Sequence, residues 1–150
     1  MNTTTGIKAY TKIGIESGIT AADPHKLISM LYEGALLAIA KAKNGILLSD
    51  IPAKCAAISK ALAIIDEGLK ACLDYNAGGE LAQNLSSLYD YMIMRLVTAN
   101  LKNDVDVLNE ISGLLTDLKG AWDTIRQSAA VQAVVQPMPA TKAQLTYEIR

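Results

Sequence analysis

The run from Gly78 to Asn100 constrains the fold more than any other part of the sequence. Its apolar side chains recur at steps of three and four, which places them on one face of a helix: Leu81, Leu85, Leu88, Met92, Leu96 and Ala99. A second apolar set lies off that stripe: Tyr89, Tyr91, Ile93, Met94 and Val97. A helix at the surface of a bundle needs only one apolar stripe. This helix is therefore predicted either to lie centrally in a core or to offer its second face to another molecule.

Three further segments show the same helical spacing. The first starts at Asp23-Pro24, a typical N-cap followed by proline in the first turn, and runs to about residue 44. The second spans about residues 49–76, and the last begins after Asp104 and carries a seam of Leu, Ile and Trp122. Four helices of about 20 residues joined by short connections predict an all-α fold, an antiparallel up-down four-helix bundle.

The segments outside these helices have a different composition. Residues 1–22 are rich in Thr, Gly and Ser with isolated apolar side chains, and are predicted to form a flexible N-terminal cap or tail. Residues 23–126 are assigned to the bundle. In residues 127–150, Ala and Val continue to Val135 and prolines follow, which predicts a short fifth helix and then a mobile tail.

Charge and hydropathy exclude several classes of partner. The net charge is −1 and the basic residues are dispersed, so no nucleic-acid partner is expected. The longest apolar stretch of the body, residues 34–40, is too short for membrane insertion, and the N-terminus does not resemble a signal peptide. Cys55 and Cys72 lie about 25 Å apart on a helix, too far for a bridge, so we expect free thiols in a reducing cytosol.

The sequence lacks the residue patterns of a catalytic or cofactor site. The single histidine, His25, sits in a first helical turn and is interpreted as a solvated residue rather than a phosphotransfer site. One histidine does not supply the Glu-x-x-His motifs of a di-iron bundle, and Gly78-Gly79 is not followed by the Lys of a phosphate-binding loop. We therefore expect no enzyme activity, no cofactor and no metal site.

Several short strings, in consistent order from about residue 6 to residue 126, resemble those of the bacterial flagellin export chaperone family. They are AY at 9–10, ADPHKLI at 22–28, MLYEGA at 30–35, IIDEGL at 64–69, GGELA at 78–82, LYDYM at 88–92, ND at 103–104 and AW at 121–122. The resemblance implies a non-catalytic, cytosolic helical bundle that binds the disordered C-terminal segment of flagellin. It also implies that the bundle prevents premature flagellin polymerisation and delivers flagellin to the gate components of the flagellar type III export apparatus.

The candidate client-binding residues come from three places: the N-terminal segment, a small-residue face of the second helix, and the second apolar face of the third. They are Ile7, Tyr10, Ala57, Ile64, Gly68, Ala71, Tyr91, Met94, Thr98 and Leu101. For the small-residue face, close helix–helix packing is the alternative. For the third helix, the alternative is coverage by the fourth helix or by the C-terminal segment.

The competing class of protein is a structural or regulatory adaptor that uses its spare apolar face for permanent homodimerisation. Under the export-chaperone hypothesis, Ile7 and Tyr10 match the N-terminal motif of the family. They are expected to cap the spare apolar groove until the client arrives.

Overall fold

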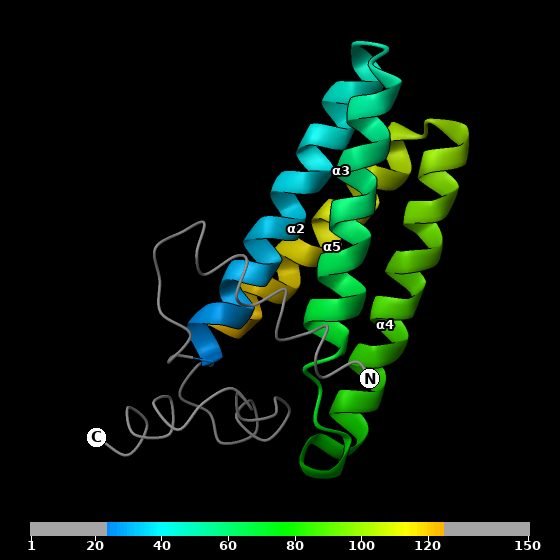
Figure 1. The fold of residues 1–150 in the computed structure, drawn as a ribbon. Helices are drawn as coiled ribbons and strands as arrows, with labels where there is room; N and C mark the ends of the chain where they lie inside the picture. Colours follow the sequence, from blue (N-terminus) through cyan, green and yellow to red (C-terminus); the bar gives the residue numbers. More distant parts are fainter. Residues whose placement is uncertain (1–23, 125–150) are drawn as a thin grey trace.

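The computed structural model describes residues 24–124. They form α2 (Pro24–Leu47), α3 (Ile51–Ala63), a π-helical continuation η1 (Ile64–Lys70), α4 (Tyr75–Lys102) and α5 (Val105–Thr124). Successive helices run in opposite directions, and no strand occurs between residues 24 and 124 (Figure 1). The prediction of an all-α, up-down helical bundle is confirmed. The N-terminal cap, with Ile7 and Tyr10, and the fifth helix fall outside the described residues.

The four helices form a square in cross-section. α2 packs against α3 and α5, and α4 packs against α5 on one flank and against α3 and η1 on the other. The interior is built mostly from aliphatic side chains, and Tyr32 and Tyr89 are its buried aromatic members. Its largest fully buried members include Leu27, Leu31 and Ile39 of α2, Ile58 of α3, Ile65 of η1, Met92 and Leu96 of α4, and Leu108 and Ile111 of α5.

Small residues bring α2 and α3 especially close together. Buried Ala and Gly residues line this contact: Ala35, Ala38, Ala42, Gly45, Ala57 and Ala61. A Cβ added at Gly45 would lie 2.8 Å from the backbone nitrogen of Lys54 and 2.9 Å from its Cα. Glycine is thus required here by the approach of the two backbones.

Aspartates set the starts of three helices, as their preference for the N-cap predicts. Asp50 accepts a hydrogen bond from Ala53 N at 3.1 Å, Asp74 from Asn76 N and Ala77 N at 3.0 Å each, and Asp104 from Val107 N at 3.2 Å. α2 ends in a Schellman motif, in which Ser49 has φ 57° and Asp50 N donates to Gly45 O at 2.7 Å.

The second and third helices differ from the predicted ones. The second becomes a π-helix over Ile64–Lys70. A π-helical turn contains more residues than an α-helical turn. The wider turn therefore keeps four residues on the buried side: Ile64, Ile65, Gly68 and Leu69. The third starts earlier than expected, because Asp74 caps it, and Gly79, with φ 52° and ψ −128°, kinks it instead of starting it.

The core face of α4 differs in two places from the apolar stripe seen in the sequence. Leu81 of that stripe is 45% exposed, and its neighbour Ala82 is buried instead. Tyr89 was placed off the core stripe but is only 2% exposed, and its hydroxyl lies 2.6 Å from that of Tyr32 on α2. Leu85 and Leu88 are half-buried at the edge of the core.

Candidate functional site

An uncovered apolar strip runs along the outside of α4. Met94, Val97 and Leu101, here named the outer stripe, follow one another at steps of three and four and therefore stack on successive turns. Met94 is 69% exposed and Leu101 79% exposed, whereas Met92, Leu96 and Ala99 on the opposite face are buried. The predicted site residues Met94 and Leu101 are thus on the surface. Val97 was missing from the predicted set, although it lies three residues after Met94.

Polar contacts tie the α5 edge of this stripe in place. Glu110 of α5 accepts hydrogen bonds from the Tyr91 hydroxyl and from Arg95 Nε, the latter at 3.0 Å. These bonds, first that from Tyr91, hold the pKa of Glu110 below its usual value, and the same contact raises the pKa of Tyr91. Thr98 Oγ1 donates back to Met94 O at 3.2 Å. Tyr91 therefore stands at the border of the stripe with a fixed ring.

An ion pair between η1 and α4 lies at the end of the stripe that precedes Met94, because Asp90 is one turn before Met94 in the same row. Lys70 Nζ lies 2.6 Å from Asp90 Oδ1, and this hydrogen bond raises the pKa of Lys70. The outer stripe consequently has polar pairs on two of its borders, Arg95–Glu110 along the α5 side and Lys70–Asp90 at the end before Met94. Such an arrangement, an apolar strip with a polar border, is typical of a surface that binds another chain.

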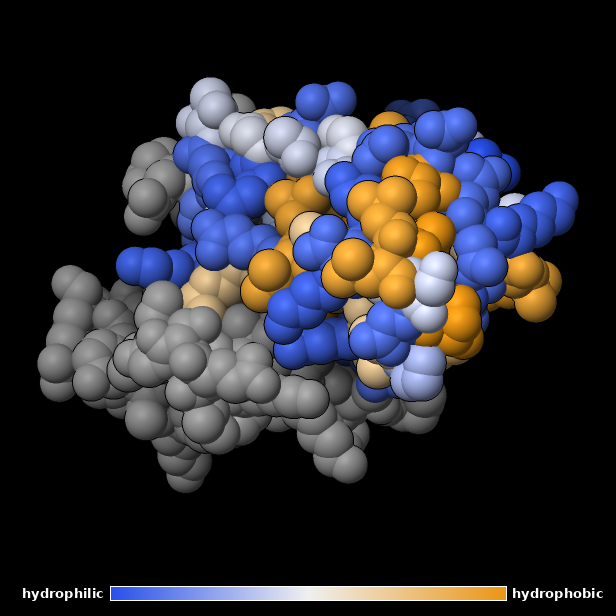
Figure 2. All heavy atoms as spheres, turned by 90° about the horizontal axis from the view of Figure 1, so that it is seen from above, coloured by the Kyte–Doolittle hydropathy of each residue, from blue (hydrophilic) through white to orange (hydrophobic). Residues whose placement is uncertain are grey.

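More apolar surface lies at the end of the bundle where α4 finishes. Leu47, Leu48 and Ile51, here named the corner, are exposed at the α2–α3 connection. Lys54 of α3 hydrogen-bonds to Asn100 O and Asn103 Oδ1, so the corner and the end of α4 belong to the same end of the molecule. Figure 2 views this end, and hydrophobic side chains gather on it between hydrophilic ones.

The small-residue face of α3 and η1, unlike the outer stripe, is mostly buried. Ala57 is 7% exposed and Ile64 4% exposed, Gly68 is buried, and Ala71 is half-buried. In the free chain these residues belong to the interior, as the helix-packing alternative predicts. Only Ala57 reaches a cleft, an open hollow of about 400 Å³ between α2 and α3 that is also lined by Leu48 and Lys60.

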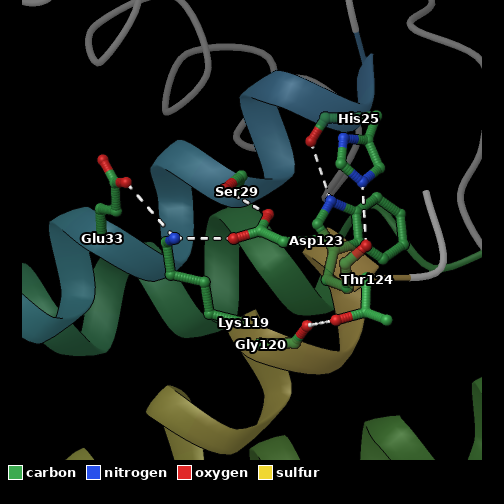
Figure 3. Close-up of polar contacts among 8 residues, drawn as sticks. His25, Ser29, Glu33, Lys119, Gly120, Asp123 and Thr124 are labelled. Carbon is green, nitrogen blue, oxygen red and sulfur yellow. Dashed lines mark hydrogen bonds and ion pairs between the residues drawn. The ribbon is translucent and has the colours of Figure 1, made fainter.

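The end of the bundle opposite the corner is closed by contacts that the sequence did not indicate (Figure 3). His25 Nε2 lies 3.0 Å from Trp122 O, Trp122 Nε1 donates to His25 O at 2.9 Å, and the two rings stack at 4.7 Å. Ser29 and Lys119 both donate to Asp123. The interpretation of His25 as a solvated residue is wrong, because it joins the start of α2 to the end of α5.

A family model described as flagellar protein FliS matches residues 6–129 of the sequence. The chain belongs to the FliS family. The matched range contains the whole described bundle and also Ile7 and Tyr10. FliS is a chaperone family and not a family of enzymes.

Individual FliS proteins from distant bacteria are similar over most of the chain. The flagellar secretion chaperone FliS of Salmonella typhimurium is 49% identical, covering 88% of this chain and 98% of its own length. FliSB of Pseudomonas aeruginosa is 45% identical, over 79% of this chain and 94% of its own. FliS of Bacillus subtilis is 39% identical, over 75% of this chain and 83% of its own length. Within the described part of this FliS-family chain, no helix is long and apolar enough to cross a membrane.

Proposed function

We propose that this FliS-family chain is a cytosolic export chaperone that binds the disordered C-terminal segment of flagellin along the outer stripe of α4. The observation that carries the proposal is the stripe itself, a row of exposed apolar side chains on a folded bundle whose family consists of flagellar chaperones. A bound segment would cover this row and lie beside the Arg95–Glu110 pair. While held there, flagellin would not polymerise, and the complex would pass to the gate components of the flagellar export apparatus.

Magnitudes indicate that the client must cover more than the stripe. Full burial of one large apolar side chain contributes about 1.5–3 kcal/mol. Ordering one residue of a disordered client opposes binding by about 1–2 kcal/mol. The three stripe residues alone therefore do not offset the ordering of a long segment. A wrapped client that also contacts Tyr91, Thr98 and the corner gains enough area for useful affinity.

The N-terminal segment enters this proposal as the occupant of the surface in the free protein. Ile7 and Tyr10 are apolar residues in a polar segment, and docking them on the outer stripe would shield it from self-association. The client would then displace them or repack them. Hydrogen exchange around residues 7–10 in the free and client-bound protein tests this part: exchange at the unprotected rate in both states would rule it out.

The proposal is tested by mixing the protein with flagellin, either intact or lacking its C-terminal segment, and measuring co-elution and mass by size-exclusion chromatography with light scattering. We expect a one-to-one complex with intact flagellin and none with the truncated form. Equal binding of truncated flagellin would contradict the proposal. A free chain that elutes as a dimer and binds neither form would instead favour the adaptor class.

A further inference from the structure

Lys54 is an unusual residue for the place that it occupies. It is 5% exposed and is the one charged side chain in the buried set of the described bundle. Its ammonium group donates to Asn100 O at 2.8 Å and to Asn103 Oδ1 at 2.7 Å. Both acceptors are neutral. A buried cation in such a setting requires these bonds, because each lost partner leaves part of the charge without compensation.

The two acceptors lie in the last turn of α4 and in the residue that ends it. The carbonyl of Asn100 is among the last four of the helix, which have no amide partner within it. Asn103 is the C-cap, in the left-handed region with φ 52°, and its N–H donates to Ala99 O. The partial negative charge at this helix end also favours a cation. Lys54 of α3 therefore caps α4 from a neighbouring helix.

The position of Lys54 is fixed by the tight contact between α2 and α3. Its backbone passes so close to Gly45 that a Cβ there would lie 2.8 Å from the nitrogen of Lys54. α3 also starts only three residues earlier, at Ile51, and Asp50 caps it through Ala53 N. The ammonium group thus reaches α4 from a backbone that is held on the other side by α2.

The last turn of α4 carries part of the candidate site. Leu101 lies between the two acceptor residues, and it continues the row started by Met94 and Val97. From this geometry we infer that Lys54 is a positioning residue of the site: it holds the end of α4 so that Leu101 stays aligned with the rest of the outer stripe. The consequence for binding rests on the proposed function, whereas the consequence for the helix end does not.

The test compares Lys54→Met, which keeps the aliphatic stem but removes the charge, with Lys54→Arg and with Lys41→Met, a control at an exposed lysine of α2. Amide hydrogen exchange is measured at residues 99–103 of the free protein, and the affinity for a peptide covering the C-terminal segment of flagellin is measured by calorimetry. We expect Lys54→Met to speed exchange at these residues and to weaken the peptide about tenfold, roughly the loss of one strong hydrogen bond. Lys54→Arg should recover part of the exchange protection and part of the peptide affinity. Lys41→Met should change neither the exchange at residues 99–103 nor the affinity.

A destabilised control separates positioning from general stability. Trp122→Phe removes the indole bond to His25 O at the opposite end of the bundle. It should lower the melting temperature and leave the peptide affinity unchanged. Unchanged exchange at residues 99–103 in Lys54→Met would overturn the inference, and so would an equal loss of affinity in Trp122→Phe.

A second pair of variants keeps the inference testable should Lys54→Met not fold. Ser49 and Asn103 have nearly the same left-handed backbone, with φ 57° and 52°, but only the Asn103 side chain accepts from Lys54. Asn103→Gly should speed exchange at the end of α4 and weaken the peptide, whereas Ser49→Gly should leave exchange at residues 99–103 unchanged. Equal behaviour of the two would overturn the inference. If the unmodified protein does not bind the peptide, the proposed function fails, and the exchange data on the free protein still decide the role of Lys54.

Discussion

The small-residue face of α3 and η1 and the outer stripe of α4 look alike in the sequence, since both are apolar surface beyond what one helix face needs. In the structure the first is interior and the second is open. The difference comes from which face each set occupies: Ala57, Ile64 and Gly68 are buried in the bundle, whereas within residues 24–124 no helix covers the outside of α4. A surplus of apolar residues thus marks a binding surface only where no helix covers it.

The comparison is tested most strongly by shortening one large side chain on each face. Ile64→Ala should lower the free energy of unfolding by about 2–5 kcal/mol, because it leaves a cavity in the core. Met94→Ala, at an exposed position, should change it by less than about 0.5 kcal/mol. Urea denaturation followed by circular dichroism measures both. A similar loss of unfolding free energy in the two variants would mean that Met94 is a core residue, and the outer stripe would then not be an open surface.

The buried tyrosine pair Tyr32 and Tyr89 makes the stability of the core depend on pH. Burial raises the pKa of Tyr32 to about 12, and the hydrogen bond with Tyr89 partly opposes this. Its unfolded pKa is about 10, so above pH 10 the unfolded state loses the proton first and stability falls as pH rises towards 12. The total loss from this group is on the order of 3 kcal/mol, because one pKa unit corresponds to about 1.4 kcal/mol.

The check is the free energy of unfolding as a function of pH in the unmodified protein and in Tyr32→Phe. The variant should show a flatter decline between pH 10 and 12, since phenylalanine has no proton to lose. Tyr75→Phe, at an exposed position in the first turn of α4, serves as the matched control and should keep the steep decline. A parallel pH dependence in all three proteins would show that Tyr32 is not the group responsible.

Two glycines show the same contrast between a covered and an exposed helix face. Gly45 lies in the tight α2–α3 contact, and Gly113 lies on an open helix surface. Gly45→Ala should destabilise the protein by about 1–3 kcal/mol, since its Cβ meets the backbone of Lys54. Gly113→Ala on α5 has nothing within 4 Å and should stabilise it by up to about 1 kcal/mol through helix propensity. Thermal unfolding shows both effects, and a gain of stability in Gly45→Ala would mean that α2 and α3 are not in close contact.

Much of the fold follows from local sequence signals. Apolar spacing predicted the four helices, and Asp104 marked the start of the last one. The π-helix and the early start of α4 did not follow, because they depend on how η1 packs against its neighbours and on the cap at Asp74. Leu81 was misplaced because it and Ala82 both lie one helical turn before Leu85, and spacing alone does not tell which of the two faces the core.

The candidate site was only partly predictable. Met94 and Leu101 were recognisable because they lie off the core stripe of a long helix. Ala57 and Ile64 were not distinguishable from surface residues, because spacing does not reveal which face a second helix covers. Lys54 gave no signal at all: a lysine in a helical segment normally indicates solvent, and only the three-dimensional contact with Asn100 and Asn103 reveals its partners.

The central claim is that the outer stripe is where the client binds. Its most direct test is calorimetric titration of the flagellin C-terminal peptide into the double variant Met94→Ser with Leu101→Ser, with Leu37→Ser as a control at an exposed leucine of α2. The double variant should keep its circular dichroism spectrum and bind at least about tenfold more weakly, because two apolar side chains no longer contribute. The control should bind like the unmodified protein. Unchanged affinity in a folded double variant would mean that the client does not bind along the outer stripe.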